Sequence, residues 1–221
     1  MSRTSRQSKA RKRPIPSYLW LVGLLLVAVV VTVLISVTRG DETSTDAAAT
    51  GGDVVAETND VVIDGESIPE LGDVESNAGS LAPQVTGFGF GGEPITLLEE
   101  GTPTVVGFFA HWCPHCQSEV DELSKHFGSD GLPDDVNVVA VSTGVDASGS
   151  NYPPSAWFES EGWPAPVLTD DAESSVAQAY GLSAYPFWAV VDADGRIITR
   201  TAGGIGAAQF DEFVELARTG G

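Results

Sequence analysis

The most constraining feature of this 221-residue chain is its only pair of cysteines, Cys113 and Cys116, which are separated by two residues. A disulfide stabilises a fold largely by restricting the unfolded chain, and closing a loop of about 15 residues contributes roughly 3 kcal/mol. The much shorter loop between these two cysteines would contribute clearly less. Two sulfurs on one helical turn can instead switch between dithiol and disulfide with almost no chain movement. The pair therefore predicts a redox site rather than a structural cross-link.

The residues on either side of the pair predict a strand before it and a helix after it. Residues 104–110 form a β-branched and aromatic run, and residues 113–127 place apolar side chains at helical spacing. The cysteines are therefore expected at a strand-to-helix junction. Unpaired amides and the helix dipole favour negative charge at a first helical turn, so Cys113 is expected to form a thiolate easily.

His115, which lies between the cysteines, is the predicted modulator of Cys113. The helix dipole alone contributes roughly 0.3 to 1 kcal/mol, so a large stabilisation of the thiolate needs a second source. An imidazole can donate a hydrogen bond to the thiolate or pair with it as imidazolium, and both contacts stabilise the reduced form. The alternative is a histidine that simply faces solvent.

Strand and helix signals alternate along the rest of the chain. The expected strands are 136–142, 165–168, 187–191 and 196–201, and the expected helices are 153–158, 173–180 and 207–218. Residues 192–195, Asp-Ala-Asp-Gly, predict a hairpin turn between the last two strands. The pattern predicts one α/β domain, large enough to bury an apolar core without disulfides.

The N-terminal residues predict a membrane anchor. Residues 1–17 carry six basic side chains, and residues 18–37 form an uncharged apolar run. About 20 apolar residues span a bilayer, and basic residues remain on the cytoplasmic side. A cleaved signal peptide is the alternative, but the run exceeds the usual apolar region, and residues 36–40 lack an Ala-x-Ala-like cleavage site. We therefore expect a cytoplasmic N-terminus, a single transmembrane helix and an extracytoplasmic remainder.

The exported part is strongly acidic. All 31 Asp and Glu residues of the chain follow the apolar run, but only five of its Lys and Arg residues do. This charge disfavours nucleic acid and anionic lipid headgroups as partners, since both are negative. Residues 38–82 are expected to form an acidic flexible linker with a short strand near 61–72. The compact domain is expected at 83–221.

Two segments resemble the signatures of the thioredoxin superfamily. Residues 108–116 read Phe-Phe-Ala-His-Trp-Cys-Pro-His-Cys, which resembles its active-site segment, and residues 184–187 read Ala-Tyr-Pro-Phe, which resembles its second signature. The stretch 83–217 is similar to the membrane-tethered extracytoplasmic thioredoxins of the TlpA and ResA kind. The resemblance implies a thioredoxin fold, which is a central mixed sheet flanked by helices.

The resemblance also implies roles for individual residues. Cys113 would react first with a partner and Cys116 would resolve the mixed disulfide. Tyr185 and a cis Pro186 would lie against the active disulfide and present backbone to substrate peptides. Trp112 is expected to pack beside the thiols and shape the docking surface.

Glu119 strengthens the match, because in such proteins a glutamate three residues after the second cysteine lies near the resolving thiol and can shuttle its proton. Thioredoxin itself uses a buried aspartate six residues before the first cysteine, a position that Gly107 occupies here. Glu119 is the natural replacement for that acid. A solvated helix carboxylate is the alternative.

The leading functional hypothesis is a thiol-disulfide oxidoreductase that acts on exported thiol or disulfide proteins, with a membrane redox partner and without a cofactor. The Pro114-His115 dipeptide resembles that of the oxidant DsbA, whereas the tethered relatives are commonly reductants. Because the dipeptide acts directly on thiolate stability, an oxidising or isomerising poise is favoured.

A metal-binding module is the second hypothesis. Two sulfur and two nitrogen donors lie within six residues, and soft thiolates would select copper(I) or zinc; the donors are His111, Cys113, His115 and Cys116. A helix that begins at Cys113 does not obviously bring the two histidines together, and structural zinc usually draws ligands from two separated segments.

Overall fold

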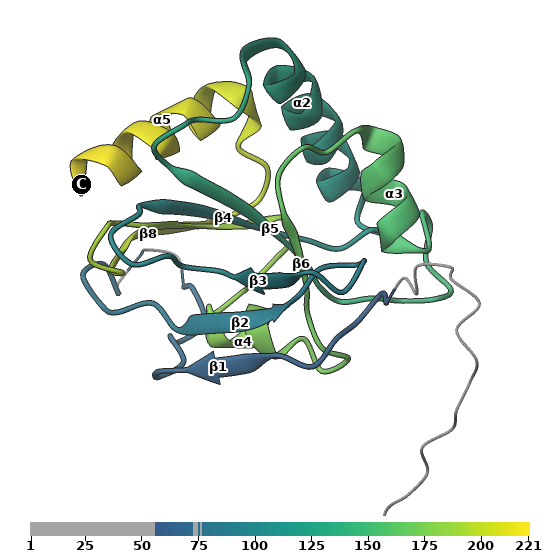
Figure 1. Ribbon diagram of the computed structural model, residues 1–221, viewed down its shortest axis with the longest axis horizontal. Coiled ribbons are helices and arrows are strands. Elements are labelled where there is room, and N and C mark those ends of the chain that lie inside the picture. The colour runs from purple at the N-terminus through teal and green to yellow at the C-terminus, as the bar shows by residue number, and fades with distance from the viewer. Residues whose placement is uncertain (1–55, 73–74, 76) are drawn as a thin grey trace, which may run out of the picture. The chain divides into compact units, whose positions relative to one another are not determined.

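The computed structural model describes residues 56–72, 75 and 77–221, and a five-stranded sheet lies at their centre (Figure 1). Its order is β6-β5-β4-β7-β8, with β4 parallel to β5, β5 parallel to β6, and β7 antiparallel to both β4 and β8. The strands are β4 (Thr104–Phe109), β5 (Asn137–Ser142), β6 (Val167–Thr169), β7 (Phe187–Val191) and β8 (Ile197–Ala202). The predicted mixed sheet is confirmed.

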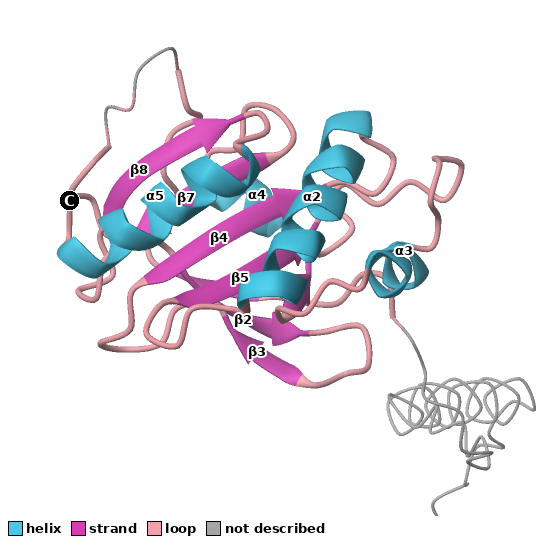
Figure 2. Ribbon diagram, turned by 90° about the horizontal axis from the view of Figure 1, so that it is seen from above, coloured by secondary structure: helices cyan, strands magenta, loops and turns pink. Residues whose placement is uncertain are grey.

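Three helices cover one face of this sheet, as Figure 2 shows: α2 (Pro114–Asp130), α3 (Pro154–Glu161) and α5 (Gly206–Thr219). Their apolar faces meet the rings of Phe109 and Trp188, whose centroids lie 5.3 Å apart with the rings edge to face. Phe127 of α2 and Phe210 of α5 meet at 5.0 Å. Aromatic packing of this kind holds the C-terminal half of α2 against α5 and the sheet.

The other face is covered by the short helix α4 (Ser175–Ala179) and a three-stranded antiparallel sheet (Figure 1). The strands of this small sheet are β1 (Val62–Asp64), β2 (Gln84–Phe88) and β3 (Pro94–Thr96). All residues of β4 and β7 are buried, because the central sheet is covered on both faces. Such strands read as continuous apolar runs, which is why the sequence pattern locates them well.

The compact unit begins before residue 83, where the linker was expected to end. A strand forms at β1, within the predicted stretch 61–72, and pairs with β2. Polar contacts hold the flanking residues: Asn59 Nδ2 donates to Thr169 Oγ1 at 2.6 Å, and buried Arg200 Nε donates to Glu75 Oε2 at 2.8 Å. The segment therefore has no core of its own, and strand pairing, polar bonds and the packing of Ile63, Ile68 and Leu71 against the domain core hold it in place.

The predicted basic N-terminus 1–17 and the predicted span 18–37 lie outside the described residues. Within the described part of the chain, no helix is long and apolar enough to cross a membrane.

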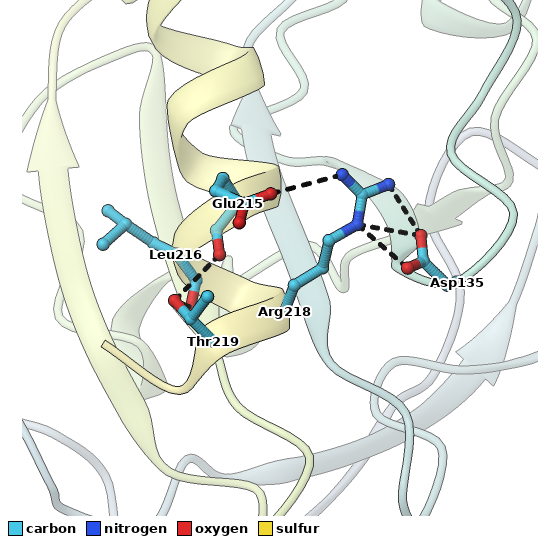
Figure 3. A network of polar contacts seen from close by, with 5 residues as sticks. All are labelled: Asp135, Glu215, Leu216, Arg218 and Thr219. Carbon is cyan, nitrogen blue, oxygen red and sulfur yellow. Dashed lines mark hydrogen bonds and ion pairs between the residues drawn. The ribbon is translucent and has the colours of Figure 1, made fainter.

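The last turn of α5 is fastened to the loop that precedes β5 (Figure 3). Arg218 Nε and Nη2 donate to the carboxylate of Asp135 at distances of 2.7 to 3.0 Å, and the Glu215 carboxylate lies 3.6 Å from Arg218 Nη1. The Arg218 guanidinium lowers the pKa of Asp135 through these bonds. The pair is exposed, so it orients the helix end more than it stabilises the fold.

Candidate active site

The two cysteines lie at the predicted junction between β4 and α2. Cys113 is the N-cap residue of α2, and its amide donates to the carbonyl of Ala110 at 3.0 Å. Both cysteines are free thiols, and neither is freely exposed: Cys113 is 7% exposed and Cys116 is completely buried. The pair is therefore asymmetric, because only the Cys113 sulfur borders the surface.

The environment of Cys116 favours its protonated form. Burial raises the pKa of the Cys116 thiol strongly, and the nearby Cys113 and Glu119 add to the rise. The backbone of Ala110 lowers the same pKa through a hydrogen bond, but this effect is smaller than that of burial. Cys116 is therefore a thiol in the reduced protein at neutral pH.

The loop before β7 lies against Cys113, as the resemblance implies. The Tyr185–Pro186 peptide bond is cis, and the Tyr185 carbonyl oxygen lies 3.9 Å from Cys113 Sγ. A second cis bond, which the sequence did not suggest, joins Tyr152 to Pro153. Cys113 Sγ thus faces the backbone of Tyr185, whose polar groups could also form hydrogen bonds with a bound peptide.

Trp112 flanks the same sulfur. Its indole Nε1 donates to the Gly144 carbonyl at 2.7 Å, and its ring meets the Tyr185 ring edge to face with centroids 5.8 Å apart. About a third of Trp112 is exposed, at 37%. Trp112, the residue before Cys113, and Tyr185, whose carbonyl faces the Cys113 sulfur, therefore pack against each other.

His111 has a role that the sequence did not reveal. It is 1% exposed; its Nδ1 lies 2.7 Å from the Ser150 carbonyl oxygen, and its Nε2 accepts the Asp146 amide at 3.1 Å. Both ring nitrogens are thus used by backbone groups, and the ring holds the loop 146–150 beside the active-site turn. No local pattern signals this contact, because its partners lie 35 and 39 residues away.

The proposed metal ligands do not come together as a donor set. Both ring nitrogens of His111 are used by the backbone of the neighbouring loop, so neither offers a lone pair to a metal. His115 is exposed on the first turn of α2, and its ring makes no hydrogen bond to any residue that the structure describes. Among the described side chains, no group of three His, Cys, Asp or Glu residues is placed to hold a metal ion.

Glu119 is buried, so the solvated alternative is excluded. Its Oε1 accepts the amides of Ile205 at 2.9 Å and Gly206 at 3.1 Å, where α5 begins. Gly204 must be small, because a Cβ atom there would lie 2.8 Å from Glu119 Oε2. Burial raises the pKa of Glu119, and this effect exceeds the lowering by the two amides. Its charge also raises the pKa of the Cys116 thiol, so the two groups lie within electrostatic reach.

Replacement of Glu119 by glutamine is expected to change how stability depends on pH. Because the folded-state pKa of Glu119 is raised, folding favours the protonated form, and stability falls as pH rises from about 4, the unfolded value, through the folded value. Glu119→Gln retains an oxygen for the Ile205 and Gly206 amides but removes this titration. Urea unfolding between pH 4 and 8 should therefore show wild type losing stability relative to the variant as pH rises. A constant difference across that range would contradict the assignment.

The packing around Gly107 explains why β4 lacks the buried aspartate that thioredoxin carries six residues before its first cysteine. A Cβ atom at Gly107 would lie 2.8 Å from ring atoms of both Phe109 and Trp188. The aromatic packing above the sheet therefore fills the volume that a side chain at this position would need. The only acid beside Cys116 among the groups that shift its pKa is Glu119, which reaches it from α2 instead.

Comparisons with known proteins agree with this fold. The family model described as Redoxin matches residues 77–212. The thiol-disulfide oxidoreductase ResA of Halalkalibacterium halodurans is 27% identical over 128 residues, which cover 58% of this chain and 69% of ResA. The thiol:disulfide interchange protein DsbE of Pasteurella multocida is 26% identical over 121 residues, which cover 55% of this chain and 62% of DsbE.

Among solved structures, the thioredoxin domain of a thiol-disulfide oxidoreductase from Bacteroides vulgatus aligns with a TM-score of 0.51 at 22% identity. The alignment covers 64% of this chain and 97% of that one, and it supports the thioredoxin fold. Since the Redoxin match extends over more than half of the sequence, the chain belongs to the Redoxin family.

Proposed function

We propose that the protein is a membrane-tethered thiol-disulfide oxidoreductase that exchanges disulfides with exported proteins through Cys113 and Cys116. The observation that carries the proposal is the asymmetry of the pair. Cys113 borders the surface beside the Tyr185 backbone, whereas Cys116 is buried and its thiol pKa is raised. A dithiol arranged in this way reacts with a partner at one sulfur and completes the reaction with the other.

In the reducing direction, the Cys113 thiolate attacks one sulfur of a substrate disulfide, and the other substrate sulfur leaves as a thiolate. Cys116 then attacks the Cys113 sulfur, which releases the second substrate thiolate and leaves a Cys113–Cys116 disulfide. The oxidising direction is the reverse. The two electrons pass between the substrate sulfurs and this pair, so no cofactor is required.

Cys116 must lose its proton when it attacks, and Glu119 is the proposed acceptor. The carboxyl group is buried within electrostatic reach of the Cys116 thiol, and its raised pKa brings it closer to that of a thiol. Its Oε1 is held by the amides at the start of α5, and only a longer contact of 3.3 Å, from Gly206, reaches Oε2. Oε2 is therefore the oxygen better able to take up the proton.

The extracytoplasmic location rests on the sequence pattern of residues 1–37, in which a basic segment precedes an apolar run. Exported proteins with thiols or disulfides are the proposed substrates, and a membrane redox protein is the proposed electron partner. Trp112, Tyr185 and Pro186 would form the surface on which a substrate peptide docks. The acidic composition of the part after residue 37 argues against nucleic acid as a partner.

The redox potential tests the proposed oxidising or isomerising poise. We expect equilibration with glutathione to give a value nearer to about −120 mV, that of DsbA, than to about −270 mV, that of thioredoxin. His115→Ala should make the potential more negative by roughly 10 to 30 mV, because we propose that an imidazole between the two cysteines favours the reduced form. His126→Ala is the matched control, since His126 lies at the other end of α2 and bonds to Asp211. A wild-type potential near that of thioredoxin would overturn the oxidising poise.

A further inference from the structure

The ring of buried His111 fastens residues 144–152, the β5–α3 loop, to the active-site turn. Its Nδ1 lies 2.7 Å from the Ser150 carbonyl oxygen, and its Nε2 accepts the Asp146 amide at 3.1 Å. Gln117 of α2 adds a second attachment: its Nε2 donates to Ser150 Oγ at 3.2 Å and to the His111 carbonyl at 2.9 Å. The loop is thus held by two residues that flank the cysteine pair in sequence.

The β5–α3 loop depends on these polar contacts, because none of its own residues is buried. Among the described residues, the two buried apolar clusters of the domain include no member of the loop. Apart from a bond of the Gly144 amide to Ser174 Oγ, its hydrogen bonds to other described segments involve His111, Trp112 or Gln117. Loss of His111 or Gln117 should therefore loosen the loop.

Trp112 links the β5–α3 loop to the surroundings of the reactive sulfur. Its indole Nε1 donates to the Gly144 carbonyl at 2.7 Å, and a Cβ atom at Gly149 would lie only 2.7 Å from the Trp112 Cβ atom. On its other contact, the indole meets the Tyr185 ring, and the Tyr185 carbonyl faces Cys113 Sγ. The loop therefore packs on the same tryptophan that packs on the residue facing the sulfur.

We propose that His111 is a positioning residue for thiol-disulfide exchange, which holds the β5–α3 loop against Trp112 so that the loop extends the surface on which a peptide disulfide docks at Cys113. Gln117 holds the same loop from α2. The proposal rests on the proposed function, in which Trp112 is part of the docking surface. A preformed surface lowers the entropic cost of aligning a peptide disulfide with the sulfur, whereas a small disulfide does not need the loop.

The test compares two reactions of the reduced full-length protein: exchange with a synthetic peptide disulfide and exchange with hydroxyethyl disulfide. Both begin with attack by Cys113, but only the peptide is long enough to reach the loop. His111→Ala should slow the peptide reaction about three- to tenfold, the usual effect of a lost hydrogen bond, and leave the small-disulfide reaction unchanged. His111→Asn keeps a donor for the Ser150 carbonyl and should give an intermediate peptide rate. Gln117→Ala, which retains the His111 ring, should also slow only the peptide reaction.

Ser118→Ala is the matched control. Ser118 follows Gln117 on α2, and its Oγ donates to the Pro114 carbonyl at 3.1 Å within the helix rather than to the loop. This variant should react like wild type with both disulfides. Hydrogen exchange measures the loop directly: residues 144–152 should exchange faster in His111→Ala and Gln117→Ala than in wild type or Ser118→Ala, because the loop opens more often.

Wild-type peptide exchange in His111→Ala would overturn the proposal, as would equal slowing of both disulfides or unchanged hydrogen exchange in the loop. If His111→Ala does not fold, Gln117→Ala provides the same comparisons, because Gln117 is only partly buried. Failure of the proposed function has a different signature, which is a wild-type protein that reacts with hydroxyethyl disulfide but not with the peptide disulfide.

Discussion

Replacement of Cys113 by serine is expected to abolish disulfide exchange, with a loss of at least about 10³-fold, because no other exposed or partly exposed thiol can form the mixed disulfide. Cys116→Ser should instead retain the first step and accumulate a mixed disulfide between Cys113 and the substrate. Mass spectrometry after acid quenching distinguishes the two variants. Retained turnover in Cys113→Ser would contradict the assignment of the attacking sulfur.

The two serine variants also serve as controls for one another. Serine is nearly isosteric with cysteine, so both proteins should fold, and melting curves would verify this. A mixed disulfide that forms through Cys116 in the Cys113→Ser protein would reverse the proposed roles of the two sulfurs.

Introduction of a side chain at Gly107 is expected to cause a large loss of stability. The Cβ atom would lie 2.8 Å from the rings of Phe109 and Trp188, and overpacking of a buried site typically costs about 1 to 3 kcal/mol. Gly107→Asp should cost more than Gly107→Ala, because it also buries an acid without a charged partner. Urea denaturation of both variants measures the loss.

Gly128→Ala provides the matched control for these variants. Gly128 lies inside α2, and nothing is within 4 Å of a Cβ atom placed there. Alanine favours a helix by about 0.5 to 1 kcal/mol over glycine, so this variant should be as stable as wild type or more stable. Equal stability of Gly107→Ala and Gly128→Ala would show that the aromatic layer can adapt, contrary to our expectation.

The sequence predicted the five strands of the central sheet and the helices that cover it, but it did not predict β2 and β3, which lie in turn-rich sequence. The apolar run at 187–191 coincides with β7, and the helices predicted from residues 113 and 207 begin within one residue of α2 and α5. These elements are encoded by local periodicity, because each must present an apolar face to the same core. The position of the cysteine pair followed from the same pattern.

Apart from the Tyr185–Pro186 loop, which the resemblance implied, features that depend on contacts between distant residues were not predicted. The ordering of the segment around Asn59 depends on Thr169, and the role of His111 depends on Asp146 and Ser150. The placement of Asp170 and Tyr185 at the same edge of the central sheet arises from the strand order, not from their spacing in sequence. Long-range polar contacts leave no periodic signal. Composition therefore suggested a flexible linker, and the close spacing of sulfur and nitrogen donors suggested that His111 could bind a metal.

The measurement that most directly tests the asymmetry of the pair is competitive alkylation of the reduced full-length protein. Limiting iodoacetamide at neutral pH, followed by peptide mapping, reports the relative reactivity of the two sulfurs. Because Cys116 is buried with a raised thiol pKa, Cys113 should carry at least about ten times more label. Equal labelling of the two cysteines, or preferential labelling of Cys116, would contradict the account.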